Sequence, residues 1–595
     1  MRANHPSQRR RLRASSCLSS ALVVALGLTS PTYAAPPAAA AAQPAAAAQP
    51  AAKPAAAQPA AKPAAAQPAT AAQPATAAQP ATAAQPATAA QPGAKPGAAA
   101  PASASVSVMV PVEKYTLQNG LEVVLHEDHR TPVVAVNVWY HVGSKDEPKG
   151  KNGFAHLFEH LMFQGSKNVG EDMFFKYLER AGASERNGTT NADRTNYFET
   201  VPANELALVL WLESDRMGWL LDHANEETFA SQRNVVKNER RQNYENAPYG
   251  LVPQFLRAAM FPANHPYHLL TIGTPEDLDA ARMDDVRAFF KTFYAPNNAT
   301  LVIAGDIDRD RAKELVHKYF SPIPKGAPPP VATKPDPGDL ATEKRLDIEA
   351  DVELPRVTIS WVTPPHFAPG DAELDLVANV LSSGKTSRLY KRLVYDLQIA
   401  QDVFAGQSSS QLASTFQITA TLKKGKSPEQ ALKLIDAEIE KLRKAPPTQD
   451  EHERARAKLL SDLVFSMEQV TARANAINNY NQLAGDPGYF PKDVARYETA
   501  TAADLQKATA DFLPQGRRVV ALVTPKPGAP KAGRLVKQTE TAAPAAAKPA
   551  AAAAKPAAAA PATGKPATAP AVKNPAVEKP AVEKPAAGTP APKGG

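Results

Sequence analysis

Three polar residues in the apolar segment Gly153–Phe163 have the spacing of a metal site. The segment has the pattern of a helix on which His156 and His160 stand four residues apart, so their rings point the same way from successive turns. Two imidazoles at this spacing can hold a zinc ion, and a carboxylate beside them can take a proton from a water molecule bound there. Glu159, one residue before the second histidine, supplies that carboxylate. The order is H-x-x-E-H, the reverse of the H-E-x-x-H helix.

The alternative is a helix with two ordinary histidines beside a solvated glutamate. The neighbouring residues argue against it, because they are large and apolar: Leu157, Phe158, Leu161, Met162 and Phe163. A polar group buried among such residues needs a partner, and a metal ion is the simplest one. We therefore favour the metal site.

A catalytic zinc ion needs three protein ligands and one open position for water. Cys17 is the only cysteine of the chain and lies in a predicted signal segment, so the third ligand must be His, Asp or Glu. Glu239, on a predicted helix spanning Glu227–Asn243, is the best candidate. By spacing alone, Glu239 would be interpreted as a surface residue of a charged helix.

The elements that must position these residues form two similar halves of an α+β fold. In the first half the pattern predicts strands at Leu121–His126, Val133–Val142, Thr195–Val201 and Ala299–Gly305, and helices at Glu171–Ala181, Glu205–Leu221, Glu227–Asn243 and Arg309–Tyr319. In the second half it predicts strands at Pro355–Trp361 and Arg518–Thr524, and helices at Ala372–Leu381, Ser387–Leu397, Pro428–Lys444, Glu451–Glu468 and Ala502–Phe512. We predict an internal duplication in which the second copy lacks the H-x-x-E-H residues.

Composition divides the whole chain further. The predicted parts are a signal peptide (1–34), a disordered Ala/Pro/Gln spacer (35–104), an N-terminal catalytic zinc-binding domain (105–321), a linker (322–345), a C-terminal non-catalytic homologous domain (346–525) and a disordered Ala/Pro/Lys tail (526–595). The signal rests on five arginines followed by a short apolar run and a small-residue cleavage site. That run is too short to span a membrane comfortably. We therefore expect an exported bacterial protein, periplasmic or extracellular, without a transmembrane anchor.

The basic charge of the chain lies outside its folded part. The signal, the spacer and the tail together carry +16, which leaves −8 for residues 105–525 out of a total of +8. An acidic folded part disfavours nucleic acid as a partner.

The chain contains several motifs, in the same order, that resemble those of the insulinase/pitrilysin family of zinc metallopeptidases. The resemblance is closest to the two-domain bacterial and mitochondrial-processing-peptidase-like branch. The resemblance covers about residues 110–525 and rests on Gly153–Phe163, Asn187–Tyr197, Arg233–Glu239, His265–Tyr267, Ile272–Gly273 and Tyr294–Ala299 followed by Gly305–Asp306. It implies two duplicated α/β-sandwich domains of the insulinase type.

The resemblance also assigns roles to individual residues. It implies that His156, His160 and Glu239 bind one Zn²⁺ per chain and that Glu159 is the general base, which passes the proton of the activated water to the leaving amine. Asn187 would hold the backbone of the substrate, and Arg356 would bind substrate from the second half. In this family substrates add as a strand to a sheet edge, which favours unfolded peptides.

Two positions depart from the family pattern. Gln232 stands seven residues before Glu239, where many members have an acidic residue, and Thr363 stands where we would expect a tyrosine that works with the arginine. Many relatives act in pairs, one chain with the metal and the other with the Arg/Tyr pair. A homodimer, or a heterodimer with a related subunit, is therefore expected.

Three functions are compatible with the sequence. The first is an exported zinc endopeptidase acting on peptides, and the second is a non-catalytic or partner-dependent subunit that binds peptides. The third is an envelope-associated interaction protein in which the Ala/Pro-rich segments carry the function. Because the chain keeps all H-x-x-E-H residues and Glu239, we favour the first.

Overall fold

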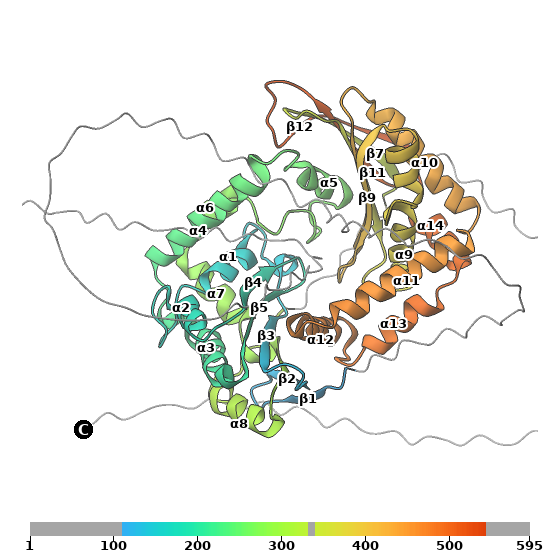
Figure 1. Ribbon diagram of the computed structural model, residues 1–595. Helices are drawn as coiled ribbons and strands as arrows, with labels where there is room; N and C mark the ends of the chain where they lie inside the picture. Colours follow the sequence, from blue (N-terminus) through green and yellow to red (C-terminus); the bar gives the residue numbers. More distant parts are fainter. Residues whose placement is uncertain (1–109, 331–339, 543–595) are drawn as a thin grey trace, which may run out of the picture. The chain divides into compact units, whose positions relative to one another are not determined.

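The computed structural model describes residues 110–330 and 340–542, and Figure 1 labels its helices and strands. The predicted signal peptide, the spacer and the last 53 residues of the predicted tail, 543–595, lie outside the described residues. Within the described ranges, none of the helices has the length and apolar character needed to cross a membrane.

The first half is built on a six-stranded sheet. Its order is β1 (Glu113–Thr116), β2 (Glu122–Glu127), β6 (Ala299–Gly305), β3 (Val133–Tyr140), β5 (Thr195–Pro202) and β4 (Glu185–Thr190). The β2–β6 pair is parallel, and the other pairs are antiparallel. The strand β4 therefore lies at one edge of this sheet.

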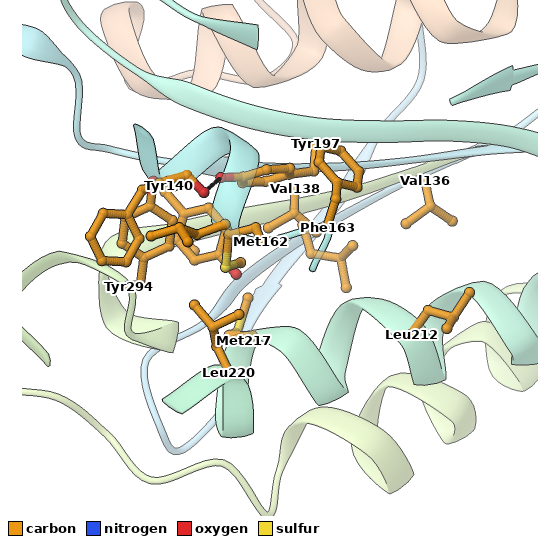
Figure 2. Packing of buried hydrophobic residues seen from close by; sticks show 14 of the residues in the cluster. Val136, Val138, Tyr140, Met162, Phe163, Tyr197, Leu212, Met217, Leu220 and Tyr294 are labelled. Carbon is orange, nitrogen blue, oxygen red and sulfur yellow. Dashed lines mark hydrogen bonds between the residues drawn. The ribbon is translucent and has the colours of Figure 1, made fainter. Parts of the chain in front are cut away.

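One face of this sheet carries the larger apolar core. The helices of this half are α1 (Phe154–Leu161), α2 (Met173–Arg180), α3 (Leu206–Trp219), α4 (Glu226–Arg240), α5 (Val252–Met260), α6 (Pro275–Ala280), α7 (Met283–Phe293) and α8 (Arg309–Phe320). Figure 2 shows Val136 and Val138 of β3 packed with Leu212 and Met217 of α3, and Met162, directly after α1, belongs to the same cluster. The helix that carries the histidines is thus fixed inside the core.

The second half repeats the plan. Its sheet has the order β12 (Arg534–Ala542), β7 (Thr342–Ala350), β11 (Val519–Pro525), β8 (Arg356–Thr363), β10 (Ser414–Leu422) and β9 (Ala400–Ser408). Its helices are α9 (Asp371–Ser382), α10 (Pro428–Lys444), α11 (Gln449–Ser466), α12 (Val470–Ala484), α13 (Phe490–Thr499) and α14 (Ala502–Phe512). Five strands correspond in order, with β7, β11, β8, β10 and β9 in the places of β2, β6, β3, β5 and β4. The remaining edge strand differs, because β1 is the first strand of its half and β12 is the last strand of its half. The predicted α+β duplication is confirmed.

Three predicted details differ from the structure. The strand β12 lies inside the predicted tail 526–595, where it pairs antiparallel with β7, because its β-branched and polar residues suit an edge strand although the surrounding segment is rich in proline. The strand β7 begins at Thr342, within the predicted linker 322–345. The predicted helix Ser387–Leu397 is a shorter, wider π-helical turn over Tyr390–Asp396.

Each half packs one of its helices on the sheet of the other half (Figure 1). The helix α5 of the first half packs on the second sheet, where Leu256 and Met260 contact a cluster containing Leu346 and Ala521. The helix α12 of the second half packs on the other face of the first sheet, where Ile477 joins a cluster containing Val124, Ala135, Val302 and Ala304. Each sheet therefore has one face covered by a helix from the other half.

Candidate metal centre

The helix α1 presents its polar side chains from a fully buried position. All eight of its residues are buried, and the exposed fractions are 3% for His156, 1% for Glu159 and 8% for His160. The rest of the helix, such as Leu157 and Phe158, packs into the apolar core. The predicted helix is present, and its polar residues cannot be solvated surface positions.

Glu239, in the last turn of α4, meets both histidines. Its Oε2 lies 3.6 Å from Nε2 of His156 and 3.3 Å from Nε2 of His160. The three candidate ligand atoms all lie within 4.8 Å of one another, and no second such group of His, Cys, Asp or Glu occurs in the part of the chain that the structure describes.

The donor set fits a zinc ion. Two imidazole nitrogens and one carboxylate oxygen are ligands that catalytic zinc commonly takes, with a further position left open. Nε2 of His160 is buried and has no hydrogen-bond partner within the described residues, which is the condition that a metal ion would relieve.

The electrostatics favour the ligand forms of these residues. Burial, assisted by the neighbouring His160, lowers the pKa of His156 to about 3, so this imidazole is neutral and can donate a lone pair. Although burial acts to raise it, the pKa of Glu239 is lowered by the nearby His160 and His156, and its carboxylate is ionised. Neutral imidazoles and an ionised carboxylate are the states that bind metal.

Glu159 is held at one oxygen and open at the other. Its Oε2 accepts a hydrogen bond of 2.6 Å from Oγ1 of Thr190, on β4, whereas Oε1 is buried and has no partner within the described residues. Burial raises the pKa of Glu159, and the Thr190 hydrogen bond and the charges of His160 and Arg194 oppose that rise. A carboxylate with one unpartnered oxygen and a raised pKa is suited to accept a proton.

The edge strand β4 passes directly over this carboxylate. A Cβ atom added to Gly188 would lie 2.9 Å from Cγ of Glu159, so a larger residue at this position would displace the base. Asn187 precedes this glycine, and its Oδ1 accepts from the N–H of Gly188 at 2.9 Å. Asn187 therefore lies on the strand that borders the site.

The second half contributes Arg356 at a different place. Its guanidinium stacks on the ring of Tyr249 at 3.6 Å from the centroid, and its Nε donates to Oγ1 of Thr421 at 3.3 Å. Tyr249 follows α4 in the sequence, so this contact links the strand β8 with the segment after Glu239.

Two residues differ from the family pattern, and the structure places both. Gln232 is buried in α4. Thr363 donates a hydrogen bond to Oε1 of Gln407 at 3.1 Å.

Sequence reasoning missed two neighbours of Glu159. Thr190 and Arg194 both lie in the motif Asn187–Tyr197, but nothing in their types marked them as contacts of the base. The Arg194 guanidinium lies over the ring of Trp139 and donates to the carbonyl oxygen of Thr189 at 2.8 Å. Pairing of β4 with β5, which was needed to place them, was itself not predicted.

Comparisons with known proteins agree with this fold. Residues 122–272 match the family model of insulinase (peptidase family M16), and residues 281–459 match that of the peptidase M16 inactive domain. The crystal structure of a protease from Helicobacter pylori superposes with a TM-score of 0.65 at 28% identity, covering 70% of this chain and 100% of that chain. The chain thus has the two-domain fold of M16 peptidases.

Sequence relatives give the family. A zinc protease of Helicobacter pylori, PqqE, is 31% identical over 374 residues, which are 62% of this chain and 83% of that protein. The mitochondrial-processing peptidase subunit beta of Lentinula edodes is 24% identical over 382 residues, 61% of this chain and 79% of that protein. The chain belongs to the insulinase family.

Proposed function

We propose that this protein is an exported zinc-dependent endopeptidase that hydrolyses peptides or unfolded polypeptides, with one Zn²⁺ per chain on His156, His160 and Glu239. The observation that carries the proposal is the convergence of three metal-ligand atoms from α1 and α4 within 4.8 Å, beside a buried carboxylate. The relative named zinc protease PqqE supports the same chemistry.

A bound zinc ion would supply the Lewis acid that polarises the peptide carbonyl and makes a water molecule acidic. Glu159 would take the proton of that water at its free Oε1 and deliver it to the nitrogen of the leaving amine. The hydrogen bond from Thr190 holds Oε2, which leaves Oε1 without a partner among the described residues and able to accept that proton. Gly188 leaves room for the Glu159 side chain, because a Cβ atom at that position would lie 2.9 Å from its Cγ.

The edge strand β4 suggests how a substrate binds. An extended peptide can add to the edge of a sheet by main-chain hydrogen bonds, and β4 ends the order of the first sheet next to Glu159. Asn187 would hold the peptide backbone there, and Arg356 would contribute from the second sheet. A folded protein cannot present such a free strand, so unfolded chains are the preferred substrates.

A non-catalytic or partner-dependent subunit is the second candidate. It is favoured by the match of residues 281–459 to an inactive domain and by Thr363 in place of the expected tyrosine. A relative named as a subunit of mitochondrial-processing peptidase makes a homodimer or a heterodimer with a related chain the expected assembly.

The deciding experiment compares the wild type with Glu159→Gln, which keeps the size of the side chain and removes its basicity. We expect one zinc per chain in both proteins and cleavage of a quenched fluorescent peptide by the wild type alone. Zinc without cleavage in either protein would favour the partner-dependent subunit. A wild type without zinc would refute the site.

A further inference from the structure

The first turn of α1 is capped by a residue from outside the helix. The N–H of Gly153 donates to Oε2 of Glu147 at 3.0 Å, and the N–H of Ala155 donates to Oε1 at 2.9 Å. The first N–H groups of a helix have no partner within it, so they need an acceptor from elsewhere. Glu147 therefore satisfies two N–H groups of the helix that carries both histidines.

The helix cannot supply this cap itself. Gly153 has φ +97°, and a Cβ atom on it would lie 2.9 Å from the carbonyl oxygen of Ile272, so the usual capping residues Ser, Thr, Asp and Asn are excluded there. The third helical position, where a capping box has Glu or Gln, is His156. Because that position carries a metal ligand, the cap must come from elsewhere.

The second half shows the ordinary arrangement of the same helix. The helix α9 also begins after a glycine, Gly370, with φ +100°. Here the N–H of Gly370 donates to Oε2 of Glu373 at 3.0 Å. Counted from the two glycines, Glu373 occupies the position of His156. In α1 this position is occupied by His156, the proposed ligand, and Glu147 caps the helix from outside instead.

The direction of the His156 ring depends on this first turn. Its Nδ1 is buried and has no hydrogen-bond partner in the described ranges, although the second nitrogen of a metal-bound histidine is usually held by such a bond. The turn before Glu147 is anchored to the β4–β5 connection, because the N–H groups of Ser144 and Lys145 donate to the carbonyl oxygens of Asn191 and Ala192 at 3.1 and 2.9 Å. Glu147 thus ties the helix start to the strand that carries Thr190.

We infer that Glu147 is a positioning residue of the metal centre: its carboxylate fixes the first turn of α1 and thereby the direction in which His156 presents Nε2. This inference rests on the proposed zinc site. It predicts that loss of the carboxylate weakens metal binding even where the fold survives.

The test uses Glu147→Ala and Glu147→Gln, with Glu373→Ala as the matched control. Glu373→Ala removes the equivalent cap from α9, a helix of the second half that carries none of the proposed ligands. The measurements are zinc affinity by competition with a chelator, the visible absorption spectrum of the Co²⁺-loaded protein, and the melting temperature of the metal-free protein. We expect zinc affinity to fall about 10- to 100-fold in Glu147→Ala, as is typical when a partner behind a metal ligand is lost.

The spectrum of the cobalt protein should change in Glu147→Ala, because the geometry of the ligands changes. Glu147→Gln keeps one accepting oxygen and should fall between the wild type and Glu147→Ala. Glu373→Ala should lower the melting temperature and leave affinity and spectrum at wild-type values.

The inference is overturned if Glu147→Ala keeps wild-type affinity and spectrum, or if Glu373→Ala weakens zinc binding equally. Should Glu147→Ala fail to fold, as judged by circular dichroism, the Gln variant is subject to the same two criteria. A wild type that binds no zinc would instead overturn the proposed function, and this inference with it.

Discussion

Each half places an equivalent helix, α1 or α9, beside the equivalent edge strand of its own sheet, β4 or β9, but the side chains of the two helices differ. Counted from the glycines that precede α1 and α9, Glu159 and His160 correspond to Leu376 and Val377, both fully buried. The second half shows that the fold at these positions is satisfied by apolar side chains. The first half instead buries ionisable groups, which costs free energy unless they find partners. The proposed chemistry therefore rests on polar residues that the fold does not need at these positions.

The largest expected effect comes from making α9 resemble α1. The double substitution Leu376→Glu and Val377→His would bury ionisable groups in the apolar core of the second half. We expect the free energy of unfolding to fall by about 3–5 kcal/mol, the range for an uncompensated buried charge. Chemical denaturation measures this, and an unchanged stability would show that the two positions are not equivalent to Glu159 and His160.

The reciprocal change should abolish zinc binding and stabilise the metal-free protein. Glu159→Leu with His160→Val removes two buried polar atoms that lack a hydrogen-bond partner, Oε1 and Nε2. Removing such groups should raise the free energy of unfolding of the metal-free protein by about 1–3 kcal/mol. The comparison is made by denaturation after treatment with a chelator. A less stable variant would mean that the polar residues support the fold even without metal.

A smaller effect is expected from Thr190→Val, which has nearly the same shape and loses the hydrogen bond to Glu159. We expect kcat to fall about 10-fold while zinc affinity stays unchanged, because only the base loses its support. Thr189→Val, on the same strand, is the control, since its hydroxyl donates to Asn196 and accepts from Arg194 but does not bond Glu159. Equal losses in both variants would assign the effect to the strand and not to Glu159.

The role of Arg356 can be tested in the same series. If it binds substrate from the second half, Arg356→Ala should raise KM for a peptide about 5- to 30-fold, which corresponds to about 1–2 kcal/mol for a lost charged hydrogen bond, with zinc content unchanged. Tyr249→Phe keeps the ring on which the guanidinium stacks and should leave KM near the wild-type value. A KM unaffected by Arg356→Ala would exclude this residue from the substrate site.

The smallest effect concerns an ion pair of the second half. Arg388 donates through Nε and Nη2 to Glu451 at 2.8 and 2.7 Å and, with Thr448, lowers the pKa of Glu451 to about 2. The stabilisation is present above the ordinary glutamate value of 4.5 and is lost as the pH falls towards 2. Because the pair is partly exposed, Glu451→Gln should cost at most about 1 kcal/mol at pH 7. Denaturation of metal-free protein at pH 7 and pH 3 would measure the difference, which should shrink at the lower pH.

Periodicity and motifs predicted much of the fold, but they missed edge strands and also two inner strands of the second sheet, β7 and β10. The strand β4 reads Glu-Arg-Asn-Gly-Thr-Thr and contains no large apolar residue, so its pairing with β5 has no local signal. The strand β12 was hidden by the proline-rich composition around it. The exchange of α5 and α12 depends on contacts between residues far apart in the sequence, which periodicity cannot report.

The candidate site was predicted to a similar extent. The spacing of His156 and His160 on one helix is a local pattern, and Glu239 was placed by resemblance. Thr190 and Glu147 reach α1 from a strand and from a turn, and their types are ordinary for such places. Their importance follows from two hydrogen bonds to backbone and one to a carboxylate, which only the folded chain brings together.

Because α12 covers one face of the first sheet, that face can be covered only after most of the second half has been synthesised. The first sheet is complete once β6 has been made, yet Val124, Ala135, Val302 and Ala304 lack their cover until Ile477 has left the ribosome. During that interval the nascent chain displays an apolar sheet face of the kind that chaperones bind and that aggregates form from. Neither half should therefore be soluble when produced alone, whereas the two halves produced together should find each other through these same two helices.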